Sequence, residues 1–172
     1  MLMIEHRLIE RMLGVINREL EHIRETGKVD PLFIDTVVDF IEIYADRTHH
    51  GKEEDIFFRE LSKKEMSGPD QQLMEELVDD HVYGRRITGE LTDANAQYRN
   101  GEKSALAVIT ENLGVLTDFY PRHIEKEDKV FFPASRNYFT EEEDRALVEE
   151  FLEFDRKMIH EKYRGVIERW DK

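Results

Sequence analysis

The chain has 172 residues, and 40% of them are hydrophobic, so one domain with one apolar core is expected. The formal net charge of -14 argues against nucleic acid or an anionic membrane as the main partner. The chain has no cysteine, which excludes disulfides, zinc–thiolate sites, protein-ligated iron–sulfur clusters and thiol catalysis.

Five helices are predicted from the hydrophobic pattern. Apolar residues recur at spacings of three and four without β-branched alternation, which is typical of amphipathic helices. Gly27 ends the first helix, Asp30 and Pro31 begin the second, and Thr140 forms a capping box with Glu143. In chain order, the predicted helices span about residues 2–26, 31–65, 69–99, 103–133 and 141–170.

Four long helices joined by short turns favour an all-α, up-down-up-down four-helix bundle, with the fifth helix packed across it. We expect a single domain over residues 1–172, with the bundle at about 2–135 and a C-terminal helical extension at about 138–172. The N-terminus carries charges from its fifth residue, unlike a signal peptide, and no stretch approaches the roughly 18 apolar residues of a membrane span. A cytoplasmic location is therefore expected.

One ten-residue pattern occurs twice. Residues 49–58 read HHGKEEDIFF, and residues 123–132 read HIEKEDKVFF. The second and fourth helices of such a bundle run in the same direction, so the two copies should lie at the same level. In each copy a histidine precedes a glutamate by four residues, which places both side chains on one helix face. The pairs are His49–Glu53 and His123–Glu127.

The doublet of His49 and His50 raises the question of which histidine faces the core. At 3.6 residues per turn, offsets of minus four, plus seven and minus eleven lie on the same helix face. The residues at these offsets are Ala45, Ile56 and Val38 for His49, and Asp46, Phe57 and Asp39 for His50. The face of His49 is more apolar, so we predict that His49 points inward and His50 outward.

Two inward His–Glu pairs at one level predict a metal site. A buried carboxylate is costly unless it is paired or metal-bound, and helical bundles hold di-iron sites built from inward His and Glu. Surface ion pairs are the alternative interpretation, but the repeat disfavours it because packing alone does not require His and Glu on a core face. His6 and His81 also have apolar neighbours at helical spacings and should face the core, whereas His22 should be exposed.

These residues resemble the hemerythrin family, specifically its bacterial and archaeal branch of HHE cation-binding proteins. The resemblance covers about residues 2–135. Its motifs are EHRLIERML around His6, HHGKEEDIFF, EELVDDHVYGRR around His81, and YPRHIEKEDKVFFP. It implies a bundle that holds two irons joined by an oxo or hydroxo bridge. It also implies that Glu53 and Glu127 bridge the irons, that His49 and His123 bind one iron, and that His6 and His81 bind the other.

Two positions depart from the oxygen-carrying members of that family. Arg85 stands where they have a second histidine on the third helix, and the last motif is HxxxE, with Asp128 adjacent, where they have HxxxxD. Six ligands leave two irons under-filled, so we hypothesise that His160 on the fifth helix is a fifth histidine ligand. The predicted metal ligands are His6, His49, Glu53, His81, His123, Glu127 and His160.

The expected function is that of a non-haem di-iron protein that binds a small diatomic molecule or a peroxide (O2, NO or H2O2) for sensing, storage or detoxification. The alternatives are an iron store or donor for the repair of damaged iron centres, and a structural module without metal. The expected partners are the small ligand and an unidentified redox partner, without nucleic acid or membrane. Tyrosines that could assist the site are Tyr44, Tyr83, Tyr120 and Tyr163.

Overall fold

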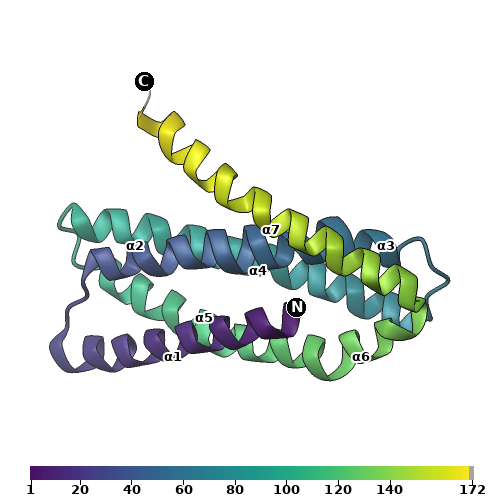
Figure 1. The fold of residues 1–172 in the computed structure, drawn as a ribbon. Helices are drawn as coiled ribbons and strands as arrows, with labels where there is room; N and C mark the ends of the chain where they lie inside the picture. The colour runs from purple at the N-terminus through teal and green to yellow at the C-terminus, as the bar shows by residue number, and fades with distance from the viewer. Residues whose placement is uncertain (171–172) are drawn as a thin grey trace.

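The computed structural model describes residues 1–170 and is a bundle of four long helices with a fifth helix laid along it (Figure 1). The first helix is α1 (Leu2–Thr26) and the third is α4 (Gly68–Arg99). The second consists of α2 (Pro31–Asp39), the π-helical segments η1 (Phe40–His50) and η2 (Glu53–Phe58), and α3 (Arg59–Leu61). The fourth consists of α5 (Ala105–Lys126), the π-helical η3 (Glu127–Phe131), α6 (Phe132–Ser135) and the 3-10 turn η4 (Arg136–Tyr138). The fifth is α7 (Glu141–Trp170). The predicted all-α bundle is confirmed.

The helix ends follow the local signals in the sequence. Gly27 closes α1 in the left-handed conformation, with φ of 64°, and the Asp30 side chain accepts a hydrogen bond from the Leu32 amide at the start of α2. Thr140 and Glu143 form the predicted capping box: the Thr140 amide donates to Glu143 Oε2 at 2.9 Å, and the Glu143 amide donates to Thr140 Oγ1 at 3.3 Å.

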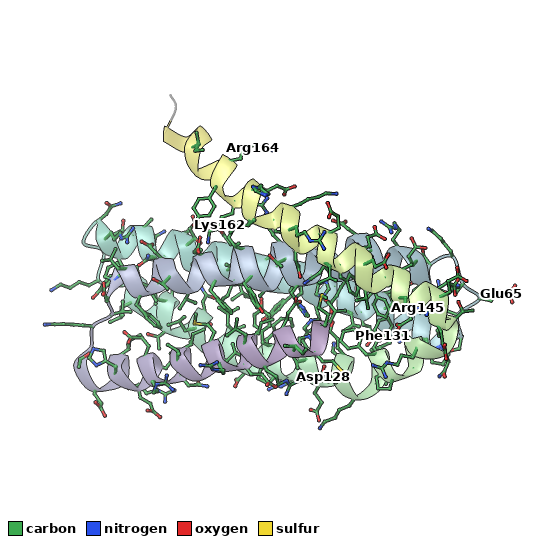
Figure 2. The ribbon with its side chains drawn as sticks, viewed as in Figure 1. Glu65, Asp128, Phe131, Arg145, Lys162 and Arg164 are labelled. Carbon is green, nitrogen blue, oxygen red and sulfur yellow. The ribbon has the colours of Figure 1, made fainter. Side chains whose placement is uncertain are left out.

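Successive helices of the bundle run in opposite directions, so the second and fourth helices are parallel (Figure 1). From the end of the fourth helix, α7 turns back and follows the second helix. Ion pairs connect the two, including Arg59–Glu150 at 2.9 Å. Lys162 of α7 still pairs with Asp39 at 2.9 Å, and beyond this residue α7 diverges from the bundle (Figures 1 and 2).

The apolar core is divided into two clusters along the bundle. The larger cluster includes Ile16 of α1 and Leu113 of α5, and the smaller includes Phe58, Phe131 and Phe151. The smaller cluster contains phenylalanines from both copies of the sequence repeat. The charged halves of the two copies lie between the two clusters, and so do the predicted inward histidines of all four helices. Among residues 1–170, no helix has the length and apolar character needed to cross a membrane.

Candidate metal centre

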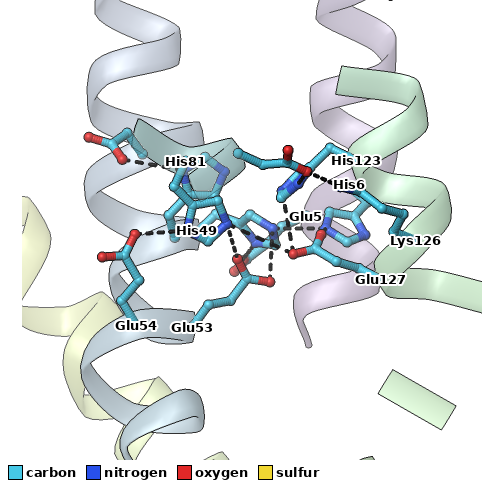
Figure 3. Close-up of polar contacts among 12 residues, drawn as sticks. Glu5, His6, His49, Glu53, Glu54, His81, His123, Lys126 and Glu127 are labelled. Carbon is cyan, nitrogen blue, oxygen red and sulfur yellow. Dashed lines mark hydrogen bonds and ion pairs between the residues drawn. The ribbon is translucent and has the colours of Figure 1, made fainter. Parts of the chain in front are cut away.

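A layer of buried polar side chains crosses the bundle between the two apolar clusters. Histidines from all four helices and two glutamates meet there (Figure 3), and each of these residues is at most 1% exposed. The six residues are His6, His49, Glu53, His81, His123 and Glu127. The structure therefore brings together six of the seven residues that the sequence predicts as metal ligands.

These six side chains, together with that of His50, form two groups that could each hold a metal ion. Each residue offers one ligand atom, and all ligand atoms of a group lie within 4.8 Å of one another. We call them the three-histidine group and the two-histidine group. The three-histidine group is His50, Glu53, His81 and His123. The two-histidine group is His6, His49, Glu53 and Glu127.

The two carboxylates connect the groups. Glu53 directs Oε1 toward one group and Oε2 toward the other, and Glu127 does the same from the opposite helix. This arrangement suits carboxylates that bridge two metal ions. The Nε2–Oε distances are 3.4 Å for His49–Glu53, 3.4 Å for His81–Glu53, 3.1 Å for His6–Glu127 and 3.3 Å for His123–Glu127.

The pairing of histidines differs from the one that the family resemblance implied. His6 lies beside His49, with their Nε2 atoms 2.8 Å apart, and His81 lies beside His123, with ring centroids 5.0 Å apart. The expected pairing of His49 with His123, and of His6 with His81, was wrong. The parallel second and fourth helices stand on a diagonal of the bundle, so the nearest histidine to each motif comes from an antiparallel neighbour.

His50 is a core residue, and the prediction that it faces solvent was wrong. It is 2% exposed, and its ring stacks on that of His81 at a centroid distance of 3.8 Å. The reason lies in the π-helical segment η1, where the Gly51 amide bonds to the Asp46 carbonyl five residues earlier. Bonds from i to i+5 place more residues in each turn than the 3.6 assumed for an α-helix, so His49 and His50 both face inward.

The repeat itself held a signal for His50 that the 3.6-residue period obscured. In the second copy the equivalent position is Ile124, which is apolar in the sequence and 3% exposed in the structure. Because the two copies occupy equivalent places in the bundle, an apolar residue at this position indicates that the first copy faces inward there too. Functional sites often lie at π-helical segments, and each copy of the repeat contains one.

His160 does not join the site. It is exposed on α7, outside both groups, so the structure contradicts the hypothesis that it supplies the fifth histidine. The fifth histidine of the cluster is His50, which comes from the second helix. His22 is exposed, as predicted.

Each of the five clustered histidines is held by a carboxylate at Nδ1. A proton on Nδ1 that donates to this carboxylate leaves the Nε2 lone pair free for a metal, which is the usual arrangement of metal-binding histidines. The Nδ1–carboxylate distances are 2.8 Å for His6–Asp128, 2.9 Å for His49–Glu5, 3.2 Å for His50–Asp46, 2.7 Å for His81–Glu54 and 3.1 Å for His123–Asp80.

Basic residues lie outside these carboxylates and neutralise their negative charge. Arg85 donates to Asp46 at 2.7 Å and to Glu54 at 2.6 Å, so one guanidinium supports the partners of His50 and His81. The remaining pairs are Arg7–Asp128, Lys52–Glu5 and Lys126–Asp80. The orientation of the histidines is thus fixed from outside the layer.

The residues present fit a pair of metal ions. Among the side chains that the structure describes, nine buried nitrogen or oxygen atoms lack a hydrogen-bond partner, and seven of them belong to this layer. They are Nε2 of His50, His81 and His123, and both carboxylate oxygens of Glu53 and Glu127. Unpaired buried polar atoms are costly, and metal ions at the centre of the layer would satisfy these seven.

The electrostatics of the layer favour a cation. Burial raises the pKa of Glu127, but His123, His6 and His81 overcome this effect and hold the pKa well below its usual range. Burial likewise lowers the pKa of His81, but Glu127, Glu53 and Glu54 raise it to about 11. The same carboxylates that would retain a proton on His81 would attract a metal ion in its place.

Aromatic side chains enclose the layer. Phe132 stacks on His6 at a centroid distance of 5.8 Å, and Phe58 stacks on His81 at 6.1 Å, so the phenylalanines of the repeat form an apolar wall. Of the four tyrosines singled out from the sequence, Tyr120 lies at the site, with its ring 6.4 Å from that of His50. Burial raises the pKa of Tyr120, which stays a neutral phenol. Tyr163 is 61% exposed on α7.

A comparison with protein-family models gives one match. The model described as Hemerythrin HHE cation binding domain matches residues 1–135 of the chain. The matched part contains all seven residues of the two groups and ends before α7. Comparisons with curated proteins and with solved structures gave no match.

Proposed function

Because the chain belongs to the hemerythrin HHE cation-binding domain family, we propose that it is a non-haem di-iron protein that binds a small diatomic molecule or a peroxide. The three-histidine and two-histidine groups would each hold one iron, and Glu53 and Glu127, whose oxygens point to both groups, would bind both irons. An oxo or hydroxo group between the irons would complete the centre that the family resemblance implies. Bound iron would supply reversible binding of the small ligand, or its reduction with electrons from the unidentified redox partner.

The observation that carries this proposal is the set of seven unpaired buried donor atoms in one layer. Imidazole nitrogens and carboxylate oxygens are together typical ligands of non-haem iron. The anchoring of every histidine through Nδ1 supports iron binding over a structural role, since a purely structural histidine needs no free Nε2 aimed at four carboxylate oxygens.

The number of protein atoms available as metal ligands supports an exchangeable coordination position on one of the irons. Five imidazole nitrogens and four carboxylate oxygens make nine donors, whereas two six-coordinate ions take about twelve. The two-histidine group has one imidazole fewer than the other group, so the open position belongs there. The neighbouring wall is Phe132, which would exclude water and favour a neutral ligand of low polarity.

A cleft beside this wall supports a small ligand. It lies between the start of α1, α6 and α7, and its lining includes Leu2, Phe57, Phe132 and Phe151. Its volume of about 170 Å³ is well below the roughly 300–1,000 Å³ of pockets for drug-sized molecules. Arg136 and Asp144 also line the cleft, but its small volume suits a diatomic gas or hydrogen peroxide better than an organic substrate.

The iron-donor alternative gains less support from the site. A donor must release its metal readily, but here each histidine is buried and held by an outer carboxylate, which favours retention. The test is iron content together with the visible spectrum, first without oxygen and then after exposure to air. We expect about two irons per chain, from the two groups, and near-ultraviolet absorption after oxidation. Trace metal after expression in iron-rich medium would refute the proposal.

A further inference from the structure

Both copies of the sequence repeat build the same three-residue chain around the layer. In each copy a lysine bonds to a carboxylate, and that carboxylate holds the Nδ1 atom of a histidine in the layer. The carboxylate comes each time from the preceding helix of the bundle, directly before another histidine of the layer. The two chains are Lys52–Glu5–His49 and Lys126–Asp80–His123.

The chains differ at their outer ends. The Lys126 side chain keeps 34% of its surface exposed. The Lys52 side chain is fully buried, and its Nζ also donates to Asp155 Oδ1 of α7 at 2.7 Å. A buried ammonium needs compensation, and Glu5 and Asp155 share that role. Of the two lysines, Lys52 is thus the one that bonds to the fifth helix, and its chain ends on His49 of the two-histidine group.

The sequence of the first copy permits this close approach. Gly51 faces α7, and a Cβ atom there would lie 2.9 Å from the ring of Phe154, adjacent to Asp155. The equivalent residue of the second copy is Glu125, which is exposed. A small residue is thus present only where α7 docks. Leu147 and Phe151 anchor the same helix in the smaller apolar cluster.

We propose that Asp155 is a positioning residue that, through Lys52, Glu5 and His49, slows the loss of metal from the two-histidine group. This inference rests on the metal-binding function proposed above. It assigns a role to the helix outside the family match: α7 makes the two halves of a nearly symmetric centre unequal, and it secures the half that has fewer histidines and the proposed exchangeable position.

The physical reason is the balance of charge along the chain. With Asp155 present, the Lys52 ammonium is shared between two carboxylates, and Glu5 keeps enough negative charge to accept strongly from His49 Nδ1. Without that carboxylate, Lys52 neutralises Glu5 more fully, so His49 becomes a poorer donor to metal. The chain also loses one negative charge, which weakens its attraction for a cation in the two-histidine group.

The test is the rate of iron release. Wild-type protein loaded anaerobically with Fe(II) is mixed with an excess of a chromogenic Fe(II) chelator, and absorbance is followed over time. For Asp155→Asn, which removes the charge and keeps the shape, we expect one of the two irons to leave roughly tenfold faster, the lower end of what loss of an outer partner costs. The other iron should leave at the wild-type rate.

A matched control separates this effect from loosened docking. Glu150 also lies on α7 and binds Arg59 of the second helix at 2.9 Å with similar exposure, but Arg59 has no contact with a histidine of the layer. Glu150→Gln should release both irons at wild-type rates. Asp155→Glu keeps the charge, and its rate should stay within about twofold of wild type.

Three outcomes would overturn the inference. Unchanged release from Asp155→Asn, with iron bound and helicity intact by circular dichroism, would show that the chain does not reach the metal. Equal acceleration by Glu150→Gln and Asp155→Asn would show that α7 acts only through docking. Wild-type protein that loads no iron would instead refute the proposed function, and the inference would fail with it.

Discussion

His50 lies flat against His81, with ring centroids 3.8 Å apart and ring planes 10° apart. Both rings belong to the three-histidine group, and the carboxylates that hold them, Asp46 and Glu54, are both bound by Arg85. The second helix therefore supplies two adjacent histidines to the centre. Arg85, which stands one turn after His81, fastens the pair from outside instead of providing a ligand.

The position of His50 gives the first prediction. His50→Ala should weaken metal binding by the three-histidine group by at least about 100-fold, because a side chain aimed at the metal is lost. His22→Ala and His160→Ala should bind metal like wild type, since both histidines are exposed. Metal content after gel filtration and titration with Fe(II) measure these effects. Full occupancy in His50→Ala would remove His50 from the ligand set.

The bridging position of Glu53 gives the second prediction. Its two oxygens lie 3.4 Å from histidines of different groups, so Glu53→Gln should impair both metal positions at once. The same holds for Glu127→Gln. Glu125→Gln is the control, because Glu125 lies two residues earlier on the exposed face and pairs with Lys129. Metal analysis that finds one equivalent retained in Glu53→Gln would argue against bridging.

Arg85 gives the third prediction. Arg85→Gln removes the charge that holds Asp46 and Glu54, so His50 and His81 lose their fixed orientation. We expect metal affinity to fall roughly tenfold, as is typical for outer partners of metal-binding histidines. The control is Arg86→Gln, because Arg86 forms an exposed pair with Glu90 on the same helix. Identical affinities for the two variants would mean that Arg85 does not support the site.

The pKa shifts in the layer predict how protein stripped of metal responds to rising pH. Nearby carboxylates raise the pKa of His6 and His81 against the effect of burial, for His81 to about 11. A histidine whose pKa is higher in the folded protein than in the unfolded chain stabilises the fold when it is protonated. Its contribution is fully present below the unfolded pKa of about 6.5 and is lost as pH rises through the folded pKa. The free energy of unfolding should therefore fall as pH rises above about 6.5, for His81 as far as its folded pKa of about 11, by up to about 1.4 kcal/mol per pH unit for each group that titrates.

At acidic pH the free energy of unfolding changes in the opposite direction and falls as pH decreases. Burial raises the pKa of Glu5 and Asp80, but hydrogen bonds from His49 and Lys52, and from His123 and Lys126, lower both pKa values overall. Their contribution is present above the unfolded values of about 4 and lost below them. Urea unfolding of stripped protein should thus show maximum stability at mildly acidic pH. A stability that rises steadily from pH 7 to 9 would contradict the raised pKa values of the histidines, and a stability that does not fall below about pH 4 would contradict the lowered pKa values of the carboxylates.

Metal loading gives the last prediction. A ligand that binds only the folded state stabilises it by about 4 kcal/mol at a free concentration 1,000 times its Kd. The loaded protein should therefore unfold at a higher temperature than stripped protein, and the difference should grow with metal concentration. The stripped protein should keep its helical circular dichroism, since the two apolar clusters that hold the helices together contain no residue of the layer. Equal unfolding temperatures would show that the layer binds no metal.

The sequence by itself determined the helices and the residues of the layer in four helices. The apolar period and the capping signals at Asp30 and Thr140 are local properties, and helix ends respond mainly to neighbours within one turn. The repeat brought His49 and His123 to one level because alternate helices of an up-down bundle are parallel. His6 and His81 followed because apolar residues surround them at helical spacing.

Only the tertiary structure decided how these residues are divided between the two groups. The π-helical η1 turned His50 inward, and its bonds from i to i+5 cannot be read from a pattern analysed at 3.6 residues per turn. The diagonal arrangement of the parallel helices paired His6 with His49. Contacts such as His6–Asp128 and Lys52–Asp155 join residues 122 and 103 positions apart. Such pairs depend on how whole helices dock, and no local property of the chain encodes them.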